Sequence, residues 1–138
     1  MKQIITARTV LAGSELEEIQ NGAVVVEDGK VVKVVPAEQL TEEDRAQAEW
    51  IAFEDETILP GLIEGHNHLS IDARKSNHLE ILGTATECKL TLLAEEGLYD
   101  DLLSGVTTVR CMGEKHDLDL KLKKEIDAGN LVGPDILP

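Results

Sequence analysis

The sequence predicts an α/β protein, in which a group of strands comes first and a β-α-β-α-β series follows. One observation is the segment AVVVEDGKVVKVV, where two valine-rich runs flank Asp28 and Gly29. Another is the region after residue 58, where short apolar runs alternate with longer segments of helical periodicity. Strands that alternate with helices along a chain favour a parallel sheet, whereas the valine-rich segment favours an antiparallel hairpin.

The first 57 residues are expected to form mainly strands. Residues 4–11 predict a strand because β-branched side chains are frequent there. Residues 23–27 and 31–35 predict the two arms of a hairpin, since the Asp-Gly pair between them tolerates the positive φ that both central turn positions need. Residues 50–53 predict a further short strand.

Two polar segments are expected to carry little regular structure. Residues 41–49 predict a short surface helix or loop, in which Thr41 and Asp44 have capping-box spacing. Residues 70–83 lack clean periodicity and predict a loop with at most a helical turn.

The stretch ILPGLIEGHNHL, residues 58–69, organises the second half of the chain. It is apolar, contains Pro60 and Gly61, and ends in two histidines one residue apart. Side chains alternate between the two faces of a strand, so His66 and His68 are expected on one face. Two imidazoles at the end of a buried strand can share one divalent metal ion. The alternative is two histidines that are exposed, or satisfied by hydrogen bonds, without a ligand role.

Two helices and two further strands are expected after this stretch. Thr84 and Glu87 have capping-box spacing and predict a helix that runs to about Ser104, with Gly105 behind it. Asp117 is expected to cap the next helix. The apolar stripes of these helices have a period of about 3.6 residues and comprise Leu90, Leu93, Leu98 and Leu102, then Leu118, Leu122 and Ile126.

The strands of this second half are 62–66, 106–111 and 135–138. The first two are apolar enough to be buried on both faces, as strands of a parallel sheet are.

Composition disfavours several classes of function. The chain has 13 Lys and Arg against 27 Asp and Glu, a net charge of −14, which disfavours nucleic acid and anionic membrane as partners. Cys88 and Cys111 lie in unrelated segments, so no disulfide framework is expected and a reducing compartment fits. The N-terminus lacks the apolar run of a signal peptide and no segment reaches the length of a membrane span. We therefore expect a cytoplasmic protein.

Three blocks of the sequence resemble the amidohydrolase superfamily. LPGLIEGHNH, which ends in the histidine pair, is similar to the first barrel strand of that superfamily. LLSGVTTVRCMG, residues 102–113, resembles the second barrel strand of the branch containing imidazolonepropionase and prolidase-like metallopeptidases, and residues 126–137 resemble the run into the third. The departures from the usual pattern are Glu64 and Cys111, each in place of Asp, and Asp135 in place of Arg.

The resemblance implies a fold in two parts. Residues 1–57 would contribute to a small composite β-sandwich, and residues 58–138 would form the first strand–helix units of a (β/α)8 TIM-like barrel. A complete barrel needs roughly 250 residues. The 138-residue chain is therefore expected to be the front third of such an enzyme, without the later units.

The resemblance also implies the chemistry. His66 and His68 would ligate one or two divalent metal ions, usually zinc, at the carboxyl ends of the barrel strands. The other ligands and the catalytic base would come from strands beyond residue 138, so no catalytic residue is expected here and the chain alone should be inactive. The complete enzyme would use metal-activated water to hydrolyse an amide or other C–N bond in a small cyclic or dipeptide-like substrate.

Three further residues are candidates near this site. Glu64 is expected to orient the end of the strand that carries the metal ligands. His78, in the following loop, and Arg110, near the end of the second strand, are candidates for contact with substrate. The alternatives are an ordinary surface histidine and a structural ion pair.

A second class of function stays open, in which the chain is a catalytically inactive fragment or an assembly module. The third strand, residues 135–138, would leave an unpaired edge, and such an edge pairs readily with another chain. We therefore expect a homo-oligomer, or pairing with a separate barrel chain.

Overall fold

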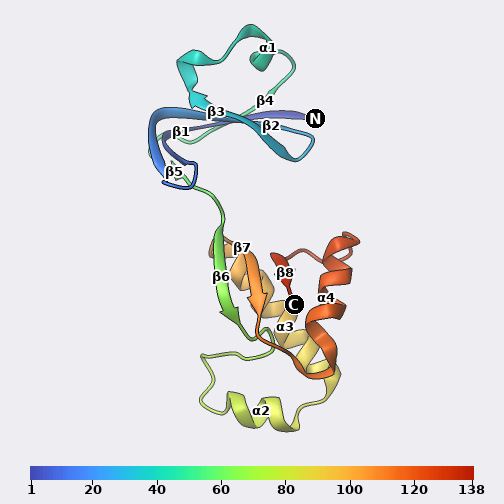
Figure 1. Ribbon diagram of the computed structural model, residues 1–138. Coiled ribbons are helices and arrows are strands. Elements are labelled where there is room, and N and C mark those ends of the chain that lie inside the picture. Colours follow the sequence, from blue (N-terminus) through green and yellow to red (C-terminus); the bar gives the residue numbers. More distant parts are fainter. The chain divides into compact units, whose positions relative to one another are not determined.

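A computed structural model of the protein describes residues 1–138. The chain divides into two compact units, Met1–Pro60 and Gly61–Pro138, each traced in Figure 1. The first unit is built around one sheet and the second contains a sheet with helices, so the predicted mixed α/β class is confirmed.

The first unit is a five-stranded sheet with the order β3-β2-β1-β4, in which β5 also pairs with β1. The strands β1, β2 and β3 are antiparallel neighbours, whereas β4 and β5 run parallel to β1. The bounds are β1 Lys2–Ala12, β2 Glu17–Glu27, β3 Lys30–Pro36, β4 Glu49–Ala52 and β5 Thr57–Ile58.

The predicted hairpin is confirmed in its turn and is longer than expected in one arm. Asp28 and Gly29 have φ values of 48° and 78°, the left-handed conformation that this two-residue turn requires. Strand β2 begins at Glu17 because its first half pairs with β1, where Glu17 lies opposite Ala12. The apolar pattern of the valine run therefore marks only the half of β2 that is buried.

The core of the first unit lies between the sheet and the segment that follows β3. It is formed by Ile4, Ala23, Val25 and Leu40, with Val35, Ala37 and Ala48 packed against them. A 3₁₀ turn, Ala37–Gln39, leads to the short helix α1, Glu42–Arg45. This helix is shorter than the predicted 41–49.

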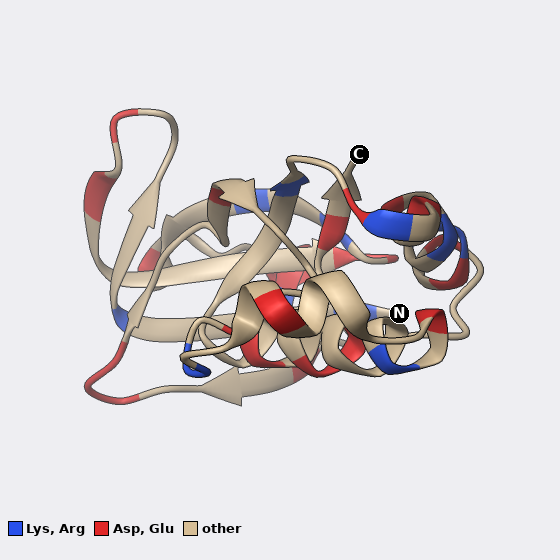
Figure 2. Ribbon diagram, turned by 90° about the horizontal axis from the view of Figure 1, so that it is seen from below, with Lys and Arg blue, Asp and Glu red and all other residues tan.

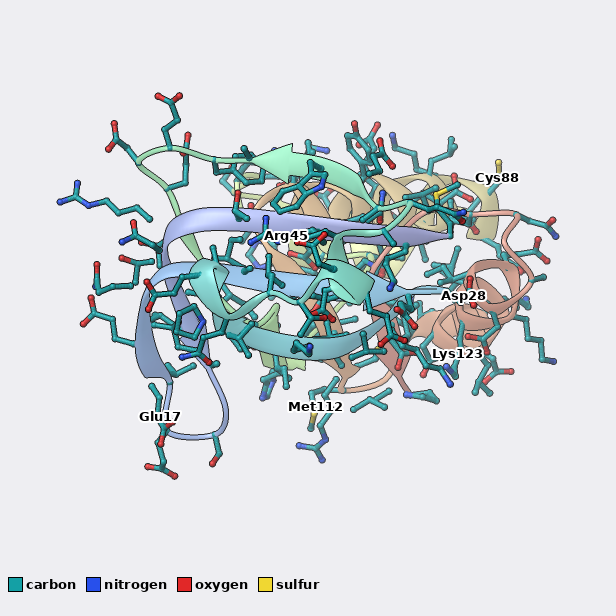
Figure 3. All side chains as sticks on the ribbon, turned by 90° about the horizontal axis from the view of Figure 1, so that it is seen from above. Glu17, Asp28, Arg45, Cys88, Met112 and Lys123 are labelled. Carbon is teal, nitrogen blue, oxygen red and sulfur yellow. The ribbon has the colours of Figure 1, made fainter.

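The predicted capping box of α1 is confirmed. The Thr41 N–H donates to Asp44 Oδ2 at 2.8 Å, and Asp44 N–H donates to Thr41 Oγ1 at 3.2 Å. The same carboxylate accepts from Lys33 Nζ on β3 at 2.6 Å, which ties the helix to the sheet. The Arg45 guanidinium lies 5.5 Å from the centroid of the Trp50 ring on β4. Figure 3 labels Arg45 among the side chains of this unit.

The second unit is a three-stranded parallel sheet with helices packed against one of its faces. The order is β6-β7-β8, with bounds Leu62–Asn67, Val106–Cys111 and Asp135–Leu137. Helices α3 (Glu87–Leu103) and α4 (Leu118–Asp127) contact β7 and β8, as Figure 1 shows. The core between them comprises Leu69, Ala94, Leu98, Val109, Cys111, Leu122 and Ile136.

The prediction that the first two strands of this sheet are buried on both faces is wrong for this chain. On β7 only one face is buried, since Val109 and Cys111 are buried while Arg110 between them is exposed. Every residue of β6 from Leu62 to His66 is exposed, and Ile63 is 72% exposed. The reason is that β6 is an edge strand, while α3 and α4 contact the other two strands. Both β6 and β8 therefore present an unpaired edge.

The helix starts show what local spacing can and cannot predict. Helix α3 is capped by Thr86, which accepts from Lys89 N–H at 3.3 Å, so the predicted start at Thr84 is wrong. Thr84 instead ends a separate helix, α2 (His78–Thr84), where its hydroxyl donates to the Glu80 carbonyl at 2.8 Å. The expected loop at 70–83 thus ends in a helix of seven residues.

The turns around α4 follow the expected positions but not always the expected contacts. Asp117 occupies the N-cap position, yet its φ is 54° and its side chain makes no capping hydrogen bond, so the predicted capping contact is wrong. Gly105 and Gly129 follow α3 and α4 with φ of 89° and 75°, the left-handed conformation predicted after a helix end for Gly105. After α4 the Asn130 N–H donates to the Glu125 carbonyl at 2.9 Å, which completes a Schellman motif.

The excess of negative charge is spread widely. Figure 2 marks acidic residues in the turns between strands and along the helices. No helix is both long and apolar enough to cross a membrane.

Candidate metal centre

The two histidines of the organising stretch lie together at the carboxyl end of β6. The centroids of the His66 and His68 rings are 5.4 Å apart, with their planes 69° from each other. Two imidazoles that bind one zinc ion at about 2.1 Å in a tetrahedral site have centroids roughly 5 Å apart. His66 is exposed and His68 half-buried, so both rings are accessible to an ion. The donor set and its spacing fit half of a metal site.

The environment of His68 favours one tautomer for metal binding. Its Nδ1 lies 3.4 Å from the Gly113 carbonyl oxygen, in the loop after β7. When Nδ1 carries the proton it donates toward this oxygen, and the lone pair of Nε2 remains free for an ion.

A β-bulge lies directly at the histidine pair. Glu64 pairs with Val109 and Asn67 with Cys111, so two residues of β6 stand opposite the single residue Arg110 of β7. Bulges disrupt the ladder locally, redirect side chains and are frequent next to active sites. The sequence showed no sign of this irregularity.

Glu64 supports the bulge. Its Oε1 accepts the backbone N–H of His66 at 2.8 Å, on a segment where the ladder is interrupted. The carboxylate therefore satisfies a strand N–H and restrains the backbone that carries the first histidine. This contact is the kind expected of a residue that orients a metal ligand.

The residue between the histidines points to the opposite side of the strand. Asn67 Nδ2 donates to Asp101 Oδ2 on α3 at 2.9 Å, and the Asn67 carbonyl accepts from Met112 N–H at 2.9 Å. Burial raises the pKa of Asp101, while the hydrogen bond from Asn67 opposes that rise. The sequence analysis assigned no role to either side chain.

A second pair that the sequence did not reveal joins the loops after β6 and β7. Ser70 is 2% exposed, and its hydroxyl donates to Glu114 Oε2 at 2.5 Å. The Ser70 N–H donates to the other carboxylate oxygen at 3.3 Å. Together with the contact between His68 and Gly113, this pair fixes the chain just beyond the candidate metal centre.

The two candidates for substrate contact differ in where they lie relative to the histidine pair. His78 is the first residue of α2, and its Nδ1 lies 2.8 Å from the Lys75 carbonyl oxygen, a local contact. Arg110 is exposed on β7, between Leu137 of β8 and the bulge of β6 that contains His66, and it forms no ion pair within 4.0 Å. The hollow beside His68 is lined instead by Ile71, Leu79, Leu82 and residues 113–115.

The site as it stands is incomplete. No group of three or more His, Cys, Asp or Glu side chains in the structure could hold a metal ion. Cys111 is buried in the core, where burial raises the pKa of its thiol, so it suits packing and not ligation.

The chain resembles known proteins in sequence and in structure. No family model matches the chain. It is 33% identical to imidazolonepropionase of Geobacillus kaustophilus (strain HTA426), over 82% of this chain and 32% of that protein, and 30% identical to that of Geobacillus sp. (strain WCH70) over the same shares. The chain thus spans about a third of the length of the curated relatives that it matches.

Solved structures agree in fold. A Xaa-Pro dipeptidase with bound methionine in the active site aligns with a TM-score of 0.82 at 24% identity, over 99% of this chain and 32% of that chain. Molinate hydrolase aligns with a TM-score of 0.80 at 25% identity, over 99% of this chain and 29% of that chain.

These similarities confirm the resemblance to the amidohydrolase superfamily. In particular, the chain is similar to the N-terminal portion of imidazolonepropionases in sequence and of prolidases in structure.

Proposed function

We propose that this chain is the N-terminal part of a metal-dependent amidohydrolase that cleaves an amide or other C–N bond. The substrate would be a small cyclic amide or a dipeptide-like molecule. The observation that carries the proposal is the pair His66 and His68 at the carboxyl end of a strand in a parallel sheet, 5.4 Å apart. Similarity to imidazolonepropionases over 82% of the chain supports it.

The architecture proposed for the complete protein is a (β/α)8 barrel beside a β-sandwich. Strands β6, β7 and β8 would be its first three barrel strands, with α3 and α4 as outer helices. The active sites of such barrels lie at the carboxyl ends of the strands. The division of the chain after Pro60 is compatible with a first unit that belongs to the sandwich.

The residues of this chain would bind and orient. His66 and His68 would hold a divalent ion, for which zinc suits the imidazole donors. Such an ion, when bound, supplies activation of water and polarisation of the scissile carbonyl. Glu64 would restrain the backbone of His66 through the 2.8 Å hydrogen bond, and Gly113 would set the tautomer of His68. Proton transfer would fall to groups outside this segment.

A second candidate function is an assembly module without activity of its own. The observation that favours it is the pair of unpaired edges, β6 and β8, beside a sheet face that the helices do not contact. Exposed edges recruit further strands. A second copy of this chain, or a separate barrel chain, would then cover the open sheet.

The metal content of ligand variants tests the first proposal. In the complete enzyme, the double substitution of His66→Ala and His68→Ala should remove the bound metal and the hydrolytic activity together. His116→Ala is the matched control, because His116 is also exposed but lies beside Glu87, at 3.9 Å, and not beside the pair. Metal at the wild-type level in the double variant, measured by mass spectrometry, would refute the ligand assignment.

A further inference from the structure

We propose that Asn67 is a positioning residue, which holds the strand end that carries the two histidines against helix α3 through Asp101. The inference rests on the proposed ligand role of His66 and His68. It assigns a function to Asn67, the residue between the two ligands. The Asn67 side chain lies on the side of the strand opposite to the histidines.

The ladder alone does not hold this strand end. Strand β6 is at the edge of the sheet, and the bulge between Glu64 and Asn67, which contains His66, interrupts its pairing with β7. Regular pairing resumes at Asn67, whose carbonyl accepts from Met112 N–H at 2.9 Å. Any anchor that acts at residue 67 therefore fixes the histidines on both sides of it.

The Asn67 side chain supplies such an anchor on a rigid support. Its amide donates to Asp101 on α3 at 2.9 Å, and hydrogen bonds to a charged acceptor are stronger than neutral ones. Helix α3 is itself held by Leu98 and Ala94, which are 1% and 0% exposed. The next inward residue of the chain, Leu69, packs into the same core.

The chemistry of the pair favours an amide at this position. Asp101 is partly buried, and the charged groups that act on it are Glu64 and Asp100, both negative, while its hydrogen-bond donor Asn67 is neutral. A carboxylate at position 67 would add a third negative charge near Asp101, and this one would lie at hydrogen-bonding distance from it. An apolar side chain at position 67 would leave the partly buried carboxylate of Asp101 without this hydrogen-bond donor, which would destabilise the folded state.

The test exchanges the two side chains. Asn67→Asp places two carboxylates face to face, and the double variant Asn67→Asp/Asp101→Asn restores one amide and one carboxylate. The matched control is Asn130→Asp, because Asn130 Nδ2 also donates to a carboxylate at 2.9 Å, that of Glu125, at the far end of α4. Circular dichroism and thermal melting show that each variant is folded.

Two measurements report the orientation of the two histidines and their ability to bind one ion together. NMR of the imidazole groups reports the orientation of His66 and His68 without metal, and titration with Cu²⁺ followed by electron paramagnetic resonance reports their joint ligation. We expect Asn67→Asp to shift the imidazole signals and to weaken Cu²⁺ binding by roughly tenfold, the lower range for residues that orient ligands. The exchanged double variant should recover both, and Asn130→Asp should change neither.

The outcomes separate this inference from the proposed function. Unchanged imidazole signals and Cu²⁺ affinity in a folded Asn67→Asp variant would overturn it, as would an exchanged double variant that recovers neither. If the wild-type chain binds Cu²⁺ no better than His66→Ala, while the imidazole signals respond as expected, the positioning role stands and the ligand role is wrong.

Discussion

Replacing Gly61 by alanine should destabilise the second unit, because the residue before β6 lies almost in contact with β7. An added Cβ would lie 2.0 Å from Oγ1, 2.4 Å from Cγ2 and 2.7 Å from Cβ of Thr107. Rotation of the threonine side chain can move the first two atoms but not the third. The proline–glycine pair of the organising stretch thus serves close packing here, since Gly61 does not have positive φ.

The size of the effect follows from this geometry. Ordinary contacts of a Cβ begin near 3.4 Å. The strands must therefore separate by about 0.7 Å even after the threonine rotates, where β6 begins its pairing with β7. Overpacking of this kind costs about 1–3 kcal/mol, and we expect the upper half of that range because backbone must move. A loss of about 2 kcal/mol lowers the ratio of folded to unfolded molecules roughly thirtyfold.

Denaturant unfolding with a separate probe for each unit measures this loss of stability. Trp50 lies in the first unit and Tyr99 in the second, and each is the only residue of its type. The midpoint reported by the tyrosine should fall in Gly61→Ala, while the tryptophan midpoint stays unchanged.

Two comparisons make this prediction specific. Gly65→Ala is the control in the same strand, because its Cβ would meet nothing within 4 Å. Adding Thr107→Ala to Gly61→Ala should rescue part of the loss, since the Cβ contact persists, and Thr107→Gly should rescue more. Equal unfolding midpoints for Gly61→Ala and Gly65→Ala would refute the packing argument.

Three further outcomes are expected. Leu98→Ala should lower the unfolding free energy of the second unit by about 2–5 kcal/mol in urea, whereas Leu92→Ala, at a position 51% exposed, should change it by less than about 1 kcal/mol; equal losses would contradict the assigned core. The Lys33 ammonium and the Thr41 capping contacts lower the pKa of Asp44 from 3.8 to about 2, so its contribution to stability is complete above pH 3.8 and is lost as the pH falls through about 2. Lys33→Met should therefore move acid unfolding to higher pH, as followed by tryptophan fluorescence, and an unmoved transition would count against the ion pair. Light scattering coupled to size exclusion should show a dimer or larger species, and a single peak near 15.1 kDa would be contrary to the open-edge argument.

Features encoded by neighbouring residues were predictable from the sequence. The hairpin turn at Asp28 and Gly29 and the capping box at Thr41 depend on the conformations and hydrogen bonds of a few consecutive residues. Strand β7 has the predicted bounds because the glycine before it ends a helix and its apolar run is short. The position of the histidine pair at the end of β6 follows from the same kind of local pattern.

Features that depend on contacts between distant residues were not predictable. Asn67 and Asp101 are 34 positions apart, and Ser70 and Glu114 are 44 apart, so no spacing rule connects them. The bulge before Asn67 arises from the register between two strands, which the sequence of one strand does not contain. The misplaced start of α3 has a different cause, because Thr84 and Thr86 both offer a capping hydroxyl and only the end of α2 decides between them.

The two candidate functions differ in what must cover the exposed face that carries the histidines. A catalytic zinc site has three protein ligands and keeps one position for water. Further barrel strands could add the ligands that His66 and His68 lack and still leave that position open. A symmetric dimer that joins two copies of this face would instead bring four imidazoles to one ion, and a closed tetrahedral site of that kind has no place for water. One metal ion per two chains without hydrolysis would therefore identify an assembly module, whereas a complete ligand set from later strands would identify the enzyme.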